Sequence, residues 1–93
     1  MSSPGPADKL HVEVVGKTES LWKGRSSYVA VPAVDGSLGI LPGRQPILTV
    51  LSAGTVEISR TDGDDVLVDI DGGFASVDQD FVTVVVENGS LPA

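Results

Sequence analysis

The sequence has no cysteine and only one histidine among its 93 residues. Without thiols, neither a disulfide framework nor a thiolate metal site can support the fold. Aromatic residues make up only 4% of the chain, so aliphatic side chains must supply most of the core. A chain of this length buries about 60–65% of its unfolded surface, which leaves room for one small domain.

Long hydrophobic runs are missing as well. No window approaches the roughly 20 apolar residues that a membrane helix needs. The first eight residues, MSSPGPAD, show no apolar run behind a basic start, and no transit peptide precedes Leu10. We therefore expect a bacterial protein on the cytoplasmic side, without direct insertion into a membrane.

Basic residues are scarce and unevenly placed. The net charge is −7, which repels phosphate backbones and disfavours binding to nucleic acid. All six lysines and arginines lie in the first 60 positions, whereas residues 61–93 contain eight acidic residues and no basic one. A basic partner is therefore expected to prefer the C-terminal third.

Short alternating segments fill most of the chain from Leu10 onward. Leu10, Val12 and Val14 alternate with other side chains at period 2, and no stretch keeps the spacing of a helix. The pattern predicts an all-β protein, a β-sandwich of two mostly antiparallel sheets, because the apolar faces must be buried against each other. The expected strands are residues 10–15, 21–23, 28–32, 38–41, 47–51, 55–60, 66–71, 74–77 and 81–87.

Glycine, proline and aspartate separate these segments. Residues 24–26 are expected to form a bend, Asp62-Gly63 the turn of one hairpin, and residues 78–80 the turn of a second hairpin. We expect a flexible N-terminal tail over residues 1–8, one domain over residues 9–88 and a C-terminal tail over residues 89–93.

Residues for catalysis or metal binding are few. His11 could join a serine and an aspartate in a hydrolytic triad, but its strand position beside Glu13 favours an exposed face. The acidic cluster near a glycine has the composition of a calcium loop without its spacing, so a solvated turn is the better interpretation. The cluster comprises Asp62, Asp64, Asp65, Asp69 and Asp71. We expect no catalytic residue, no metal and no cofactor.

Trp22 and Tyr28 leave a second alternative open. Together they could form a stacking surface for a sugar or a peptide in a free-standing ligand-binding β-sandwich. A chain with so few aromatic residues more often uses them in its core. The eleven glycines fit no phosphate-binding motif and are expected to lie in turns.

The segment DGSLGILPGRQPILT at residues 35–49 is unlike the regular strands around it. Its three glycines and two prolines fix an irregular backbone and hold Leu38, Ile40 and Leu41 at defined positions. Rigid loops of this kind are typical of places where partners dock.

This segment resembles the signature of the ATP synthase epsilon subunit family, called delta in mitochondria. The similarity extends over residues 10–87, including LHVEVV at 10–15, LWKG at 21–24, AGTV at 53–56, DGGF at 71–74 and FVTV at 81–84. It implies a ten-stranded β-sandwich on the central stalk of a proton-translocating F-type ATP synthase. Such a subunit is non-catalytic, binds the gamma subunit and rests against the c-ring, peripheral to the bacterial plasma membrane.

The resemblance also suggests which residues touch partners. Contacts with the c-ring and neighbouring stalk surfaces are expected at Asp35, Ser37, Leu38, Leu41, Arg44 and Gln45. Arg44 stands where many members have histidine, and Ser37 where many have glutamate. Many members continue after the sandwich into two helices that inhibit ATP hydrolysis and in some cases bind ATP. The last six residues, NGSLPA, are too short for such a helix, so neither property is expected of this chain.

Overall fold

The computed structural model describes residues 8–61, 63–87 and 89–90, and within these residues the chain forms ten β-strands and no helix. The strands are β1 (Leu10–Val15), β2 (Ser20–Ser26), β3 (Tyr28–Ala33), β4 (Gly36–Ile40), β5 (Ile47–Leu51), β6 (Gly54–Ser59), β7 (Val66–Ile70), β8 (Gly73–Asp78), β9 (Phe81–Val86) and β10 (Gly89–Ser90).

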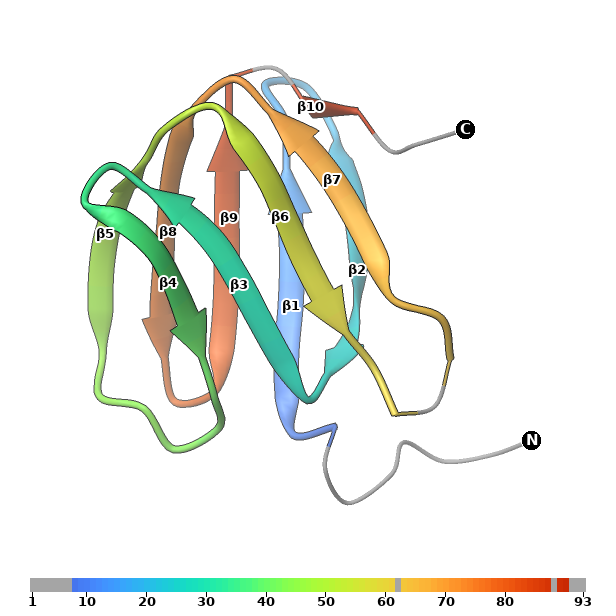
Figure 1. The fold of residues 1–93 in the computed structure, drawn as a ribbon. Coiled ribbons are helices and arrows are strands. Elements are labelled where there is room, and N and C mark those ends of the chain that lie inside the picture. Colours follow the sequence, from blue (N-terminus) through green and yellow to red (C-terminus); the bar gives the residue numbers. More distant parts are fainter. Residues whose placement is uncertain (1–7, 62, 88, 91–93) are drawn as a thin grey trace.

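The strands lie in two layers that face each other (Figure 1). The hydrogen-bonded order is β10-β7-β6-β3-β5-β8-β9-β1-β2, and β4 also pairs with β3. The path folds over between β3 and β5, which share a single register pair, Ala33 with Leu51. One layer therefore contains β10, β7, β6, β3 and β4, and the other contains β5, β8, β9, β1 and β2. The predicted fold class, an all-β sandwich of about ten strands, is confirmed.

Most strand pairs in both layers are antiparallel, and the pair β1 and β9 is parallel. His11 of β1 lies opposite Phe81 of β9, and Val15 lies opposite Val85. The pairing places a strand from the start of the domain beside a strand from its end, in the middle of one layer.

The core lies between the layers and consists mainly of valine. The inward positions of each strand are spaced by two, so Leu10, Val12 and Val14 are at most 2% exposed, as the alternation predicts. The corresponding positions of the other strands complete the core: Val29, Val31, Ile40, Leu51, Val56, Ile58, Val68, Ile70, Ala75, Val77, Val82, Val84 and Val86.

The bend expected at residues 24–26 is wrong, because β2 continues without interruption to Ser26. Gly24 pairs with Val12 in a regular antiparallel register. A β-carbon at Gly24 would come within 2.7 Å of the Trp22 ring, so glycine is needed here for close packing and not for a change of direction.

Both predicted hairpins form, with different connections. In the β8–β9 hairpin Asp78 pairs with Phe81, and Gln79 and Asp80 form the turn with φ values of 51° and 65°. The β6–β7 hairpin is longer than an Asp-Gly turn, because its register ends at Ile58 and Val66. Asp62 itself lies outside the described residues. The Arg60 side chain spans this connection by donating from Nε to the Asp64 carbonyl at 3.0 Å.

Two segments next to the expected domain boundaries make defined contacts. Asp8 is only 2% exposed, and its Oδ1 accepts a hydrogen bond of 3.0 Å from the Thr61 backbone N–H. At the other end, Gly89 and Ser90 pair with Ile70 and Asp69 of β7.

Candidate functional site

The signature segment forms β4, a loop and β5. β4 is antiparallel to β3, with Leu38 opposite Val31. Ile40 is fully buried in the core, and Leu38 packs against the core from a half-buried position. The other five residues expected to touch partners are exposed: Asp35, Ser37, Leu41, Arg44 and Gln45.

The structure explains why two positions of the signature segment are glycine. Gly39 lies under the Tyr28 ring, and a β-carbon there would overlap the Tyr28 hydroxyl. Gly43 has a φ of 84°, which favours glycine, and its N–H donates a hydrogen bond of 2.7 Å to Oδ1 of Asp80. The segment is therefore held on one side by β3 and at its far end by the β8–β9 turn.

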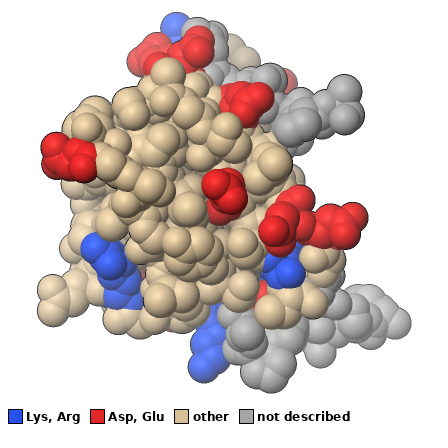
Figure 2. Space-filling model, viewed as in Figure 1, with Lys and Arg blue, Asp and Glu red and all other residues tan. Residues whose placement is uncertain are grey.

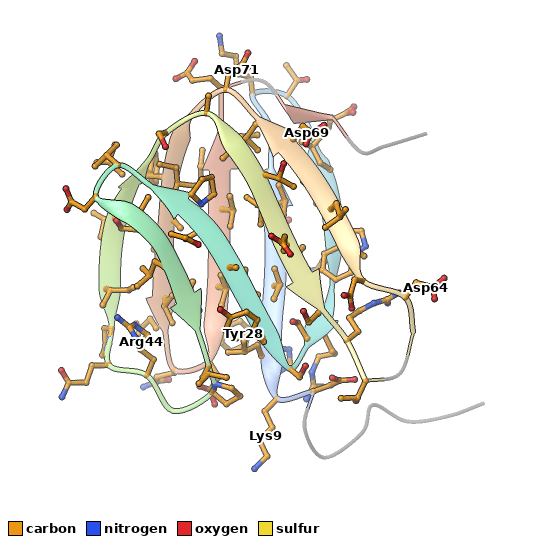
Figure 3. All side chains as sticks on the ribbon, viewed as in Figure 1. Lys9, Tyr28, Arg44, Asp64, Asp69 and Asp71 are labelled. Carbon is orange, nitrogen blue, oxygen red and sulfur yellow. The ribbon has the colours of Figure 1, made fainter. Side chains whose placement is uncertain are left out.

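The structure places five of the six expected contact residues at the two ends of β4, and Leu38 lies in the middle of the strand. Asp35 and Ser37 lie at the β3–β4 turn, where Gly36 pairs with Ala33. Leu41, Arg44 and Gln45 follow β4, on the side of the β8–β9 turn; Figure 3 labels Arg44 in this loop. Five residues of β-strand separate the ends by roughly 16 Å at about 3.3 Å per residue.

An exposed apolar surface lies beside this segment on the outer side of β5 and β8. We call it the β5–β8 patch; it consists of Val34, Leu48, Val50 and Phe74, which are 58%, 72%, 60% and 45% exposed. Val50 pairs directly with Phe74, and the Val34 N–H donates to the Val50 carbonyl at 3.0 Å. Adjacent exposed apolar side chains of this kind mark contact surfaces more often than isolated ones do.

Sequence reasoning missed this patch. The sequence predicts a strand over residues 47–51, ILTVL, and in the structure Leu48 and Val50 of this strand point outward while Leu51 is buried. The available signal was the lack of alternation, because an apolar strand with one solvent-facing side normally shows polar residues at every second position. Apolar residues on both faces indicate that both faces are covered.

Acidic side chains do not gather on one surface. Asp69 and Asp71 lie towards the end of the sandwich where β7 finishes, whereas Asp64 lies in the β6–β7 connection (Figure 3). Figure 2 shows acidic groups at several separate places on the face formed by β3, β4, β6 and β7, with a wide uncharged area between them. Among the described acidic residues of the C-terminal third, Asp64 therefore lies apart from Asp69 and Asp71.

The described residues offer no metal site. No three His, Asp or Glu side chains among them lie close enough together to hold an ion. Asp69 accepts a hydrogen bond of 2.9 Å from the Thr55 hydroxyl, and Asp64 and Asp65 are exposed. Asp62, the remaining member of the turn cluster, lies outside this part of the chain.

Trp22 and Tyr28 lie in different layers of the sandwich. Trp22 packs against the core, with the Arg60 guanidinium 5.7 Å from its ring centre, while Tyr28 covers Gly39 in the other layer. They therefore form no joint stacking surface. The His11 ring is stacked on Phe81, with ring centres 4.6 Å apart and planes inclined by 13°.

The fold and these surfaces define a class: a β-sandwich with a glycine-containing segment held against β3 and an exposed apolar patch. Across the described residues, no helix is long and apolar enough to span a membrane. Residues 9–91 match the sequence family described as the β-sandwich domain of the ATP synthase delta/epsilon chain. The chain belongs to this family, and the resemblance seen in the sequence is confirmed.

Relatives with curated names agree with the family. The chain is 42% identical over 83 residues to the ATP synthase epsilon chain of Micrococcus luteus, covering 89% of this chain and 91% of that one. It is 36% identical over 85 residues to the epsilon chain of Streptomyces griseus, covering 91% of this chain and 68% of the relative.

A solved structure shares the fold. A chain of the Euglena gracilis mitochondrial ATP synthase, determined as an assembly of OSCP, F1 and c-ring, superposes with a TM-score of 0.83 at 19% identity. The superposition covers 90% of this chain and 54% of that chain. At this identity the comparison supports the architecture of the sandwich alone.

Proposed function

We propose that this chain is a non-catalytic rotor subunit in the central stalk of a proton-translocating F-type ATP synthase. The observation that carries the proposal is the family match over residues 9–91, which includes the whole signature segment. The chain transmits rotation of the c-ring to the catalytic head through contacts with the gamma subunit. It is peripheral to the cytoplasmic face of a bacterial plasma membrane, a location supported by its bacterial relatives.

In this proposal the gamma subunit and the c-ring bind to two different surfaces of the chain. The β5–β8 patch binds the gamma subunit, because its side chains are 45% to 72% exposed and the interfaces of lasting complexes are more hydrophobic than those of transient ones. The polar residues at the two ends of β4 face the c-ring and neighbouring stalk surfaces. They are Asp35, Ser37, Arg44 and Gln45, with Leu38 and Leu41 beside them.

Capture of the cognate gamma subunit and c-ring by the purified chain tests this function. Leu48→Asp is the informative variant for the patch, because Leu48 is 72% exposed and its replacement leaves the core intact. Leu67→Asp is a matched control, since Leu67 is 42% exposed on β7 in the other layer. Arg44→Glu tests the loop that follows β4.

The expected result is capture by the parent chain and by Leu67→Asp, and loss of gamma capture by Leu48→Asp. Burying a new charge at the centre of an interface weakens binding by about 2 kcal/mol or more, roughly thirtyfold. Arg44→Glu is expected to weaken capture of the c-ring and leave capture of gamma unchanged. If the parent chain captures neither partner, the rotor function is refuted; equal loss in Leu48→Asp and Leu67→Asp refutes the assignment of the patch.

A further inference from the structure

A hollow of about 330 Å³ lies on the outer face of the layer formed by β9, β1 and β2. Its position follows from the alternation in β1, where Leu10, Val12 and Val14 point into the core and His11 and Glu13 point outward. The volume is near the lower end of the range of small-molecule sites, about 300–1,000 Å³.

The outward side chains of the hollow form two rows across the three strands. In one row Phe81, His11 and Arg25 are successive cross-strand neighbours. In the other row Thr83, Glu13 and Lys23 are neighbours in the same register. The first row thus carries two rings and a cation, and the second row carries a hydroxyl, an anion and a cation.

The two rings form a stacked pair that lines the hollow. Their centres are 4.6 Å apart, close to the spacing of about 4.8 Å between neighbouring strands, and their planes are inclined by only 13°. The rings therefore stand upright and parallel on adjacent strands. Each ring already covers one face of the other, so a ligand meets an outer face or the edges of the pair. An aromatic ligand gains more from these contacts than an aliphatic ligand of similar size, because offset-stacked and edge-to-face rings attract each other beyond the area that they bury.

Arg25 has a hydrogen-bond donor without an acceptor. Its Nε is buried, and no atom of the described residues accepts a hydrogen bond from it. A buried donor left unsatisfied costs free energy, and for a charged group the cost is larger. Nε itself is closed to solvent, so an anion in the hollow, which Arg25 lines, would meet the rest of the guanidinium group.

Neighbouring charges determine where an anion can lie. Lys23 is exposed and makes no ion pair within 4.0 Å with Glu13, its cross-strand neighbour in the described part of the chain. Glu13 repels an anion from the second row. The favourable position for an anion is therefore in the first row, next to Arg25. The Lys23 ammonium is within reach of this position, because Lys23 precedes Arg25 by two residues and lies on the same side of β2.

We propose that the hollow binds a small planar aromatic anion. The carboxylate or phosphate of the ligand accepts hydrogen bonds from Arg25 and Lys23, and its ring packs against the stacked pair of His11 and Phe81. No covalent step is involved. The site lies in the layer that also carries the β5–β8 patch, but none of the patch residues lines it.

The test is a titration of the folded chain with benzoate and with phenyl phosphate, followed by two-dimensional NMR. Both anions are expected to shift the backbone signals of His11, Arg25 and Phe81 with dissociation constants on the order of millimolar, as befits ligands of about ten heavy atoms. Benzyl alcohol tests the need for the anion, and cyclohexanecarboxylate tests the need for the aromatic ring.

Two variants distinguish this site from weak general binding to basic residues. Arg25→Gln is expected to weaken binding about tenfold, because a charge-assisted hydrogen bond is lost, while Arg44→Gln in the exposed loop leaves it unchanged. Phe81→Leu is expected to weaken the binding of aromatic anions more than that of cyclohexanecarboxylate. The fold should be unchanged, because the Phe81 side chain is 58% exposed.

Binding of benzoate alone, or of phenyl phosphate alone, supports the site and identifies its anion. Absence of any shift with both ligands at about ten times the expected dissociation constant overturns the proposal. Equal weakening by Arg25→Gln and Arg44→Gln also overturns it, as does equal binding of benzyl alcohol. If cyclohexanecarboxylate binds as tightly as benzoate, the role of the two rings is refuted.

Discussion

Asp80 and Gly43 are joined by a hydrogen bond of 2.7 Å, in which the backbone N–H of Gly43 donates to Oδ1 of the carboxylate. The bond connects the loop after β4 to the turn between β8 and β9, two segments far apart in the sequence. Asp80 occupies a turn position with a φ of 65°, where aspartate, asparagine and glycine are the favoured residues. One residue therefore shapes the turn and holds the loop that carries Arg44.

Replacing Asp80 tests this connection. Asp80→Gly retains an easy backbone conformation and removes the acceptor, whereas Asp80→Asn retains both the conformation and an acceptor oxygen. We expect the Gly43 amide to exchange its hydrogen about fivefold faster in Asp80→Gly, for a bond contributing about 1 kcal/mol. Hydrogen exchange measured by NMR checks this. Unchanged exchange in Asp80→Gly would show that the loop is held without the bond.

A methyl group at residue 39 should be poorly tolerated. Gly39→Ala places a β-carbon in the position of the Tyr28 ring and hydroxyl, so we expect a loss of about 1–3 kcal/mol in the free energy of unfolding. Gly16→Ala is the control, because a β-carbon there has ordinary contacts of 3.5 Å or more. Chemical denaturation measures both variants.

The expected loss of stability in Gly39→Ala comes from the clash with the Tyr28 side chain. Removing that side chain tests this cause. In a Tyr28→Ala background, Gly39→Ala is expected to cost less than about 0.5 kcal/mol, since nothing then occupies the space. An equally large loss in both backgrounds would place the strain in the backbone of β4 and contradict the explanation.

Ser26 is a fully buried polar residue that links β2, β3 and β6. Its Oγ accepts from the Tyr28 N–H at 3.0 Å and lies 2.7 Å from the Ser59 carbonyl and 2.8 Å from the Tyr28 carbonyl. Ser26→Ala is expected to lower the free energy of unfolding by about 1–3 kcal/mol, because a buried N–H loses its partner. Thermal unfolding of Ser26→Ala and the neighbouring Ser27→Ala provides the comparison.

The Ser27 hydroxyl makes one longer bond, 3.2 Å to the Ser59 carbonyl, from a half-buried position. Its removal is expected to cost less than about 1 kcal/mol. A larger effect for Ser27→Ala than for Ser26→Ala would show that burial does not govern the contribution of these hydroxyls.

Asp8 stabilises the fold from just before β1. Its carboxylate accepts from the Thr61 N–H at 3.0 Å and is 2% exposed, so Asp8→Ala is expected to cost about 1–3 kcal/mol in the free energy of unfolding. Asp8→Asn retains an acceptor and should cost less. Lys9→Ala, at an exposed position, is the neutral control in the same denaturation experiment. Equal stability of Asp8→Ala and the parent chain would refute this role.

Most strands can be predicted from the sequence, because each has apolar side chains at every second position on the face that packs against the core. The alternation of Val66, Val68 and Ile70, for example, requires only period-2 geometry, and all three side chains point inward as expected. Residues 81–87 behave in the same way, with Val82, Val84 and Val86 buried. These predictions depend on local spacing and not on which strands become neighbours.

Features that depend on distant neighbours were not predictable. Gly24 continues the strand because it pairs with Val12 of β1, and the residues around Gly24 do not indicate that partner. The outward direction of Leu48 and Val50 depends on the pairing of β5 with β8. The two separate ends of β4 likewise appear only after β3 and β4 are paired in register.

The parallel pairing of β1 with β9 has a consequence for synthesis of the protein. Residue 11 meets residue 81, so the middle of one layer cannot form until nearly the whole domain has left the ribosome exit tunnel. The local hairpins β1–β2 and β6–β7 can form earlier, but the pairing of β1 with β9 must wait for the last long strand. Nascent chains that stop before residue 81 should remain open to proteases, and protection should begin only once β9 has emerged.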